Sequence, residues 1–314
     1  MRTIFVINPA AGQGKGIDKF IEKIKKAAAK TSTEVEFYTT KAVGDAEVFV
    51  NEIGRLSEGS DEEIRVIACG GDGTVNEVLN GVIKYENMVM GVIPIGTGND
   101  FVRNFPEAGS FSDVEAVLRG TVVPCDAIRY TGFTDGKEQT RYCANMFNIG
   151  FDCNVADMTG TLKTYPMIAG SMAYLLGVAV TFIKKKGADL KVTVDGEVCA
   201  DGPLTLTSIA NGCYCGGGIK SNPCAVVQDG LMDVNIIRNV TRREFLGLFP
   251  KYSKGTHMEV PGIERLLDAR QCRKVVVEPH GDKMRLCVDG EIVDAGRVEF
   301  ECIPAAFRLL VPAK

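Results

Sequence analysis

Short apolar runs and longer amphipathic stretches alternate through the first hundred residues. Residues 3–7 are rich in β-branched side chains and predict a strand, whereas residues 17–30 carry apolar side chains at Phe20, Ile21 and Ile24, which is helical spacing. The same criteria predict strands at 35–39, 65–69 and 89–94, and helices at 45–56 and 75–83. Strands that alternate with helices are typical of a parallel sheet with crossover helices, so we expect an α/β domain here.

The second part of the chain has a different pattern, with many β-rich runs and few helical stretches. Turn signals such as Thr134-Asp135-Gly136 separate runs at 127–130, 142–148, 190–194, 204–211, 233–237, 274–278 and 286–288. This pattern predicts a β-sandwich-like domain at 127–302 after the α/β domain at 1–126. A last apolar run at 307–311 leaves open that the segment of about 303–314 returns to the first domain.

Composition and charge exclude some classes of partner. Hydrophobic residues make up 45% and charged residues 24% of the 314 residues, as in an ordinary globular protein. The formal net charge of −4 leaves no overall basic field for nucleic acid. Contact with an anionic membrane would need a local patch, and Lys184, Lys185 and Lys186 are one candidate.

The cysteines and the apolar segments bear on the cellular compartment. The 11 cysteines include no Cys-x-x-Cys pair and no metal-like cluster with histidine, so we expect reduced, structural thiols in a cytoplasmic protein. The apolar run after Met1 is too short for a signal peptide. The segment 167–183 is at the lower limit for a membrane span and includes polar residues. A buried helix is favoured there over a helix that touches the membrane surface, and no transmembrane span is expected.

The strongest local motif is Gly70-Gly71-Asp72-Gly73-Thr74, between a predicted strand and a predicted helix. Ligands of open α/β sheets bind at the carboxyl ends of the strands. Glycines let backbone approach a phosphate closely, and the N-terminus of the helix offers free N–H groups. Asp72 is unusual beside an anion unless a cation such as Mg²⁺ is also bound. The alternative is a tight strand-to-helix turn capped by Asp72 or Thr74.

Two further loops are expected on the same edge of the sheet. Pro94-Ile95-Gly96-Thr97-Gly98-Asn99-Asp100-Phe101 follows the next strand, and Asn8-Pro9-Ala10-Ala11-Gly12 follows the first. None of these loops has the spacing of a Gly-x-x-x-x-Gly-Lys-Ser/Thr P-loop or of a dinucleotide fingerprint. Three such loops on neighbouring strands indicate a phosphate-binding edge more strongly than any one of them.

In the β-rich part, Val194-Asp195-Gly196-Glu197 and Val288-Asp289-Gly290-Glu291 have the same local sequence. Asp-Gly is a frequent hairpin dipeptide, so both segments could be simple turns. The two histidines, His257 and His280, have no Ser or Cys nearby in a recognisable arrangement with Asp. A hydrolase triad and a zinc site are therefore not predicted.

Taken together, the motifs resemble those of the diacylglycerol kinase catalytic-domain family. The resemblance is carried by Asn8-Pro9, Gly70–Thr74, Gly96–Phe101, Asp229-Gly230-Leu231 and Asp289-Gly290-Glu291, in this order, and extends from Asn8 to Pro312. The family includes soluble bacterial diacylglycerol kinases, related bacterial lipid kinases, and sphingosine and ceramide kinases. It implies a Rossmann-like nucleotide-binding α/β domain and a β-sandwich domain, with the active site in the cleft between them.

The resemblance also implies roles for individual residues. The catalytic base maps to Glu291, and an acidic network of water and Mg²⁺ maps to Asp72, Asp100 and Asp126. A structural Mg²⁺ site maps to Asp229 and to the backbone carbonyls of Val226 and Leu231. The ATP contacts map to Asn8, Pro9, Ala10, Ala11, Gly12, Thr40, Gly70, Gly71, Asp72, Gly73, Thr74, Val75, Asn76 and Thr97.

The implied activity is transfer of the γ-phosphate of ATP to a lipid hydroxyl, with diacylglycerol or a related lipid as acceptor. Two alternatives are an NAD kinase, which also uses a Gly-Gly-Asp-Gly-Thr loop, and a catalytically silent module that binds nucleotide or lipid. A silent module would be expected to lack Glu291 or Asp72, and both are present. We expect transient association with the membrane surface, where the lipid substrate lies, and leave a homodimer open.

Overall fold

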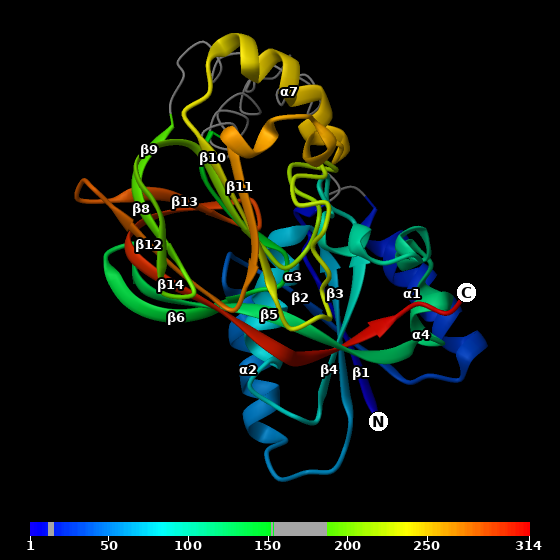
Figure 1. Cartoon of the computed structure of the whole chain (residues 1–314). Helices are drawn as coiled ribbons and strands as arrows, with labels where there is room; N and C mark the ends of the chain where they lie inside the picture. Colours follow the sequence, from blue (N-terminus) through cyan, green and yellow to red (C-terminus); the bar gives the residue numbers. More distant parts are fainter. Residues whose placement is uncertain (12–15, 152, 154–186) are drawn as a thin grey trace. The chain divides into compact units, whose positions relative to one another are not determined.

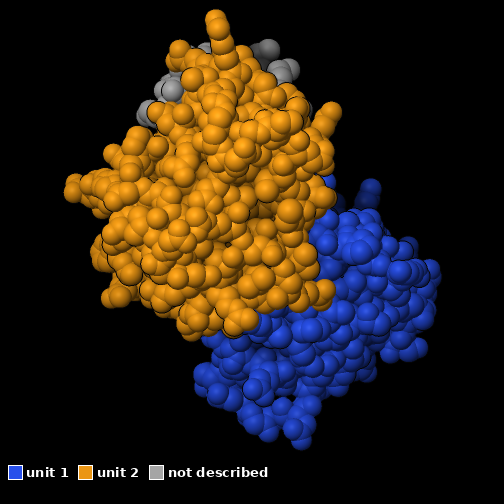
Figure 2. Space-filling view, viewed as in Figure 1, with its two compact units in different colours: residues 1–127, 304–314 blue, residues 128–303 orange. Residues whose placement is uncertain are grey.

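The structure is a computed structural model that describes residues 1–11, 16–151, 153 and 187–314 (Figure 1). Gly12, the segment 167–183 and the lysines at 184–186 lie outside the described residues. Two units are distinguished in Figure 2: unit 1 is Met1–Ala127 with Pro304–Lys314, and unit 2 is Ile128–Ile303. No helix in the described part of the chain is long and apolar enough to cross a membrane.

Unit 1 is built on a parallel sheet. The strands pair in the order β2-β1-β3-β4, with β1 at Arg2–Ile7, β2 at Val35–Thr39, β3 at Ile64–Gly70 and β4 at Met88–Pro94. The last part of β14 (Glu291–Val311) lies parallel to β4, with Leu309 opposite Met90. Strands β1, β3 and β4 are almost entirely buried, as expected for a sheet covered by helices.

The helices of unit 1 follow the expected amphipathic pattern. They are α1 (Ile17–Thr31), α2 (Asp45–Leu56), α3 (Asp72–Val82) and the short α4 (Val114–Leu118), with 3₁₀ turns η2 (Phe101–Asn104) and η3 (Ala108–Ser112). Helices α1 and α4 pack over Phe5 and Ile7 of β1, whereas α2 and α3 pack against each other (Figure 1). Helix α3 begins three residues before the expected position, because Gly71 in extended backbone leads directly into the helix at Asp72.

The strands of unit 2 are β5 (Thr121–Thr134, which begins in unit 1), β6 (Lys137–Cys143), β7 (Met146–Gly150), β8 (Ala188–Val194), β9 (Glu197–Ala210), β10 (Met232–Arg238), β11 (Leu267–Cys272), β12 (Lys274–Pro279), β13 (Met284–Val288) and the first part of β14. The strand pairs of unit 2 other than β5 with β14 are antiparallel among the described residues.

Two long strands, β9 and β14, change partners along their length. Strand β9 pairs with β8 up to Leu204 and with β7 from Leu206, and β14 pairs first with β13 and then with β12. The pairings therefore close a circuit β9-β7-β13-β14-β12-β8, and strands that switch sheets form the corners of such a fold. Its interior is apolar, with the Phe147 and Phe300 rings packed edge to face at 4.8 Å.

Three sequence expectations in unit 2 need correction. The expected strand at 142–148 is two strands, because Asn145 turns the chain: its Nδ2 donates to Tyr214 O at 2.7 Å, and its carbonyl accepts from Asn211 N and Gly212 N. Strand β11 was not expected, and neither was helix α7 (Arg242–Lys254). The helix has a capping box between Thr241 and Glu244, so its start could have been recognised from the sequence.

Candidate active site

The loops at the carboxyl ends of the parallel strands form one continuous edge. Ile7 of β1 lies opposite Cys69 of β3, which lies opposite Ile93 of β4, so these strands end at the same level. The ladder continues into the loops, where Asn8 N donates to Cys69 O and Ile95 N donates to Gly70 O, both at 3.0 Å. Strand β2 lies on one side of β1, and the chain then crosses to β3 on the other side of β1. This edge therefore contains a topological switch point, which is the usual ligand position of such folds.

The first loop, which follows β1, and the second loop, which follows β3, are joined at this switch point by side chains. Asn8 Nδ2 donates to Thr74 Oγ1 at 3.1 Å, and Asn8 Oδ1 accepts from Ala10 N at 2.9 Å. Thr74 is buried in the first turn of α3, where backbone N–H groups have no partner within the helix. The two sequence motifs of the expected nucleotide edge are therefore in direct contact.

The second loop and the third loop, which follows β4, are in contact through their backbones. A Cβ atom on Gly96 would lie 2.5 Å from Gly71 Cα, whereas a Cβ on Gly71 would lie 3.4 Å from Gly96 Cα, an ordinary contact. A Cβ on Gly70 would lie 2.2 Å from Thr74 Oγ1. Gly96 is thus required by packing between the two loops and Gly70 by packing against Thr74 of its own loop, whereas Gly71 is not required by packing.

Asp72 links the same two loops through its carboxylate. Its Oδ2 accepts from Asn99 N at 2.8 Å and its Oδ1 accepts from Asp100 N at 2.9 Å. Burial raises the pKa of Asp72, and these backbone N–H groups oppose the rise. Asn99 has a positive φ of 53°, and its side chain bonds to the backbone of Gly96, so the 96–100 turn is held on both sides.

The other two acidic residues of the expected network are also in unit 1. Asp100 is buried next to Asp72, and its Oδ1 lies 3.6 Å from Arg103 Nε. A Cβ on Gly98 would lie 2.6 Å from Asp72 Oδ2 and 3.5 Å from Asp100 Oδ2, so Gly98 leaves space beside both carboxylates. Asp126 is buried and accepts from Ala305 N at 2.7 Å, which ties the returning part of β14 to this unit.

The remaining predicted nucleotide residues differ in exposure. Thr40 is buried directly after β2, and its N–H donates to Ile7 O at 2.9 Å. Thr97 is exposed at the tip of the third loop, and Asn76 is partly exposed on α3. Val75 is buried, so only its backbone could reach a ligand. Pro9 and Ala10 are exposed and Ala11 is partly exposed.

Glu291 lies in unit 2, at the first position of β14 after a two-residue hairpin turn. The turn residues Asp289 and Gly290 have φ angles of +47° and +95°, and Val288 pairs with Glu291. Asp289 exchanges two bonds with Met146, because its N–H donates to Met146 O and its Oδ1 accepts from Met146 N at 2.9 Å. The Glu291 side chain is exposed, and no hydrogen bond or ion pair engages it within the described part of the chain.

The predicted structural metal ligands also belong to unit 2. Asp229 N donates to Val226 O at 3.4 Å, and Leu231 N donates to Asp229 Oδ1 at 3.0 Å, so the three residues share one turn. Gln271 bridges Asp229 and Asp233 at 3.5 and 3.4 Å. The described residues contain no group of three or more acidic, His or Cys side chains that could hold a metal ion.

Unit 2 also contains an apolar pocket that the sequence analysis did not predict. A pocket of about 320 Å³ and a smaller cavity of about 50 Å³ share Phe151, Thr205, Val240 and Phe245 in their walls. Further apolar walls of the smaller cavity come from Ile237, Leu248, Phe249, Leu266 and Leu267. The helical spacing of Phe245, Leu248, Phe249 and Tyr252 after the capping box was the available signal in the sequence.

One buried polar side chain faces this smaller cavity. His257 is 2% exposed, and neither ring nitrogen has a hydrogen bond of ordinary geometry. Burial lowers its pKa, and the nearby Lys251 carbonyl opposes the shift. The imidazole is therefore neutral at pH 7 and able to bond to a polar group of a mostly apolar ligand.

Comparison with known proteins identifies the family. The diacylglycerol kinase catalytic domain matches residues 2–130, and the YegS C-terminal NAD kinase beta sandwich-like domain matches residues 145–311. The chain belongs to the diacylglycerol kinase catalytic-domain family. The resemblance inferred from the motifs is thereby confirmed, and so is the type of enzyme: members of this family are lipid kinases, which use a nucleotide such as ATP.

Individual relatives of this family cover most of the chain. A diacylglycerol kinase of Mycobacterium tuberculosis (strain ATCC 25618 / H37Rv) is 28% identical over 82% of this chain and 79% of its own length. One from Bacillus subtilis (strain 168) is 27% identical over 92% and 89%. A crystal structure of a diacylglycerol kinase from Bacillus anthracis str. Sterne has a TM-score of 0.68 at 21% identity, covering 98% of this chain and 96% of that one, and shows the shared fold.

Proposed function

We propose that this lipid kinase transfers the γ-phosphate of ATP to the hydroxyl group of diacylglycerol or a related lipid with acyl chains. The observation that carries the choice of acceptor is the pocket of unit 2, whose smaller part is lined almost entirely by apolar side chains. Such walls suit an acyl chain and offer little to the charged, polar body of NAD. The names of the relatives support the same class of acceptor.

ATP, the phosphoryl donor, is proposed to bind at the loop edge of unit 1. Free N–H groups at the start of α3 would bind phosphate oxygens, and the positive end of the helix dipole would add to this attraction. Asn8 holds the first loop against Thr74, and Asp72 holds the third loop against the second. The edge is therefore organised by its own hydrogen bonds, so little of it would need to reorder when ATP binds.

Mg²⁺ is proposed to bind beside Asp72 and Asp100. The space that Gly98 leaves next to both carboxylates fits a hard cation, which prefers carboxylate oxygens. When bound, Mg²⁺ would offset negative charge on the phosphoryl group. Asp126 is proposed to belong to the same acidic group. The Asp229 turn, with the carbonyls of Val226 and Leu231, is proposed to hold a second, structural Mg²⁺.

Glu291 is proposed as the general base. The lipid hydroxyl would give its proton to the Glu291 carboxylate as the hydroxyl oxygen bonds to the γ-phosphorus and ADP leaves with the bridging oxygen. The lack of a competing partner for Glu291 among the described residues supports this role. Location of the active site between the two units stays a prediction.

The test of the acceptor is a phosphoryl transfer assay with labelled ATP and a panel of acceptors. The panel contains diacylglycerol, monoacylglycerol, phosphatidylglycerol, ceramide, a sphingoid base and NAD. We expect labelled product from diacylglycerol or a related glycerolipid, and none from NAD. Phosphorylation of NAD alone would refute the proposal, and ATP binding without transfer to any acceptor would favour a silent module.

ATP binding at the loop edge of unit 1 can be tested with Gly71→Ala. The added methyl group fits against Gly96 in the free protein, so the fold and melting temperature should be retained. It should weaken ATP binding on the order of tenfold, because it would separate phosphate from one or two backbone N–H groups. Titration calorimetry measures this change. Gly109→Ala, which meets no atom within 4 Å, is the control, and equal ATP affinity in both variants would contradict the phosphate-loop interpretation.

A further inference from the structure

Helix α7 separates two faces of very different character. Its inner face contributes Phe245, Phe249 and Tyr252 to an apolar cluster with Phe151 and Leu206. Its outer face is exposed and includes Arg243, Leu246, Gly247, Pro250, Lys251 and Lys254. The helix that lines the apolar pocket therefore also has an exposed side that faces away from the pocket.

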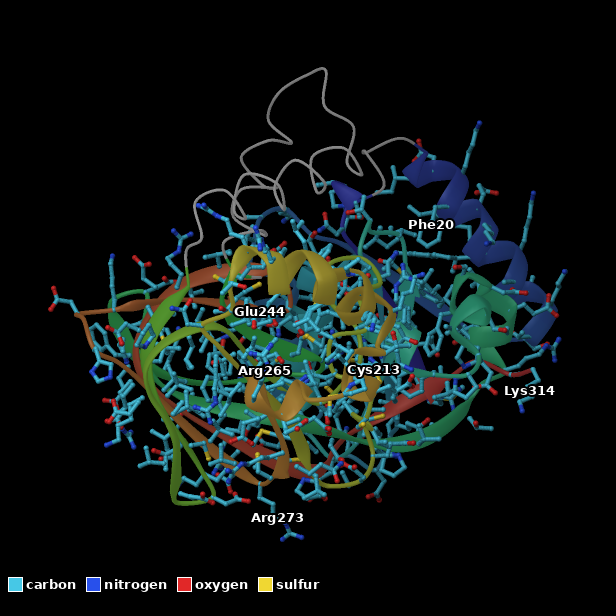
Figure 3. All side chains as sticks on the ribbon, turned by 45° about the horizontal axis from the view of Figure 1, so that its top comes forward. Phe20, Cys213, Glu244, Arg265, Arg273 and Lys314 are labelled. Atoms are coloured by element: carbon cyan, nitrogen blue, oxygen red, sulfur yellow. The ribbon has the colours of Figure 1, made fainter. Side chains whose placement is uncertain are left out.

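The outer face of α7 is cationic and contains no acidic residue. Its charges are those of Arg243, Lys251 and Lys254, in a chain whose formal net charge is −4. The only acid of the helix, Glu244, is committed elsewhere: it accepts from Thr241 N at 2.8 Å and from Arg265 at 2.7 Å. Figure 3 labels Glu244 and Arg265 beside the helix. The three cations are thus not neutralised by carboxylates of their own helix.

An apolar side chain stands among these cations. Leu246 is 62% exposed, with Pro250 one turn further along the same face and Met258 37% exposed shortly after the helix ends. Exposed leucine surrounded by Arg and Lys is the pattern of helices that lie in the interface of an anionic membrane. The cations would bind lipid headgroups while the leucine enters the boundary of the acyl chains.

We propose that the outer face of α7 docks the kinase on an anionic lipid surface. The argument rests on the proposed function, since a lipid kinase must meet an acceptor that resides in a bilayer. Charge complementarity favours a bilayer with anionic headgroups as the occupant. The position of the apolar pocket on the inner face agrees with this choice, because one helix would then contact both the lipid surface and the wall of the pocket.

Sedimentation with phosphatidylcholine vesicles, with and without phosphatidylglycerol, tests the proposal. The test variant is Arg243→Glu/Lys251→Glu/Lys254→Glu, and the matched control is Lys19→Glu/Lys25→Glu/Lys26→Glu on exposed positions of α1. Both change the charge equally. The wild type should bind anionic vesicles and lose binding as salt rises. The α7 variant should bind these vesicles at least about 30-fold more weakly than the wild type, given roughly fivefold per cation. The α1 control should lose much less affinity for the vesicles than the α7 variant.

A second substitution and a second substrate separate docking from chemistry. Leu246→Ser should weaken vesicle binding at every salt concentration while the charge stays the same. ATP turnover with a water-soluble, short-chain diacylglycerol should be unchanged in both α7 variants, which also shows that they fold. Equal loss of vesicle binding in the α1 control, or wild-type binding without salt dependence, would overturn the docking proposal. Absence of turnover in the wild type with any lipid would instead refute the proposed function and leave the vesicle result standing.

Discussion

Two hairpin turns of unit 2 have the same four-residue sequence and different surroundings. Val194-Asp195-Gly196-Glu197 joins β8 to β9, and Val288-Asp289-Gly290-Glu291 joins β13 to β14. In both, the Asp and Gly have positive φ angles, and the valine pairs with the glutamate. These are the features of the two-residue turn that Asp-Gly favours, so the backbone does not distinguish the turns.

Both turns are also anchored in the same way. Asp195 donates its N–H to Lys274 O and accepts from Lys274 N at 2.8 Å, just as Asp289 does with Met146. A third turn, at Asp135, makes the same pair of bonds with Asp294. The repeated arrangement shows that the Asp-Gly motif serves the fold in these three hairpins, whatever else its neighbours do.

The difference lies in the glutamates. Glu197 Oε2 forms an ion pair with Arg270 Nη1 at 2.8 Å, and Arg270 is also held by Asp268. Glu291 is exposed without such a partner among the described residues. The Glu197 carboxylate is engaged by an arginine, whereas the Glu291 carboxylate is available to a ligand. The comparison teaches that an identical local sequence can supply a structural residue in one hairpin and a candidate base in another.

The largest expected effect comes from neutralising each glutamate in turn. Glu291→Gln keeps the shape but cannot accept a proton, so kcat should fall about 100-fold or more, the lower end of general-base effects. Glu197→Gln should change kcat by less than about twofold, as surface substitutions usually do. Initial rates at saturating ATP and lipid measure both. Small, equal effects would place the base elsewhere, with Asp289 as the next candidate.

The anchoring aspartates give the next effect. Asp289→Ala and Asp195→Ala should each lower the free energy of unfolding by about 1.5–3 kcal/mol, because each removes a charged acceptor from a backbone N–H. Urea unfolding measures this cost. Only Asp289→Ala should also lower kcat, on the order of tenfold or more, since a displaced turn would misplace Glu291. If both variants kept full activity, the position of Glu291 would not depend on its turn.

The smallest effect is expected from the ion pair that distinguishes the glutamates. Arg270→Gln should lower the free energy of unfolding by less than about 1 kcal/mol, because the pair is partly exposed and screened by solvent. Its activity should equal that of the wild type. Thermal melts at low and high salt check the first point, with the difference from wild type shrinking as salt rises. A loss of several kcal/mol would show that Glu197 and Arg270 support the hairpin far more than an exposed pair does.

Much of unit 1 follows from local pattern. The strand at 35–39 and the helix at 45–56 have the predicted bounds, and the parallel pairing follows from the alternation of strands and helices. The loops at Asn8, Gly70 and Gly96 were expected on one edge for the same reason. What the pattern could not supply is that Asp72 bonds to the backbone of Asn99 and Asp100. Its carboxylate is far from these groups in sequence, so only folding brings them together.

The order of motifs along the chain was enough to predict the family, the two kinds of domain and the chemistry of phosphoryl transfer. Periodicity and turn chemistry act over a few residues, so a sequence records them directly. The partner-switching strands β9 and β14, the Arg270 partner of Glu197 and the pocket beneath α7 depend on residues distant along the chain. Tertiary structure alone decided these features, because each arises from contacts that exist only once separate elements have packed.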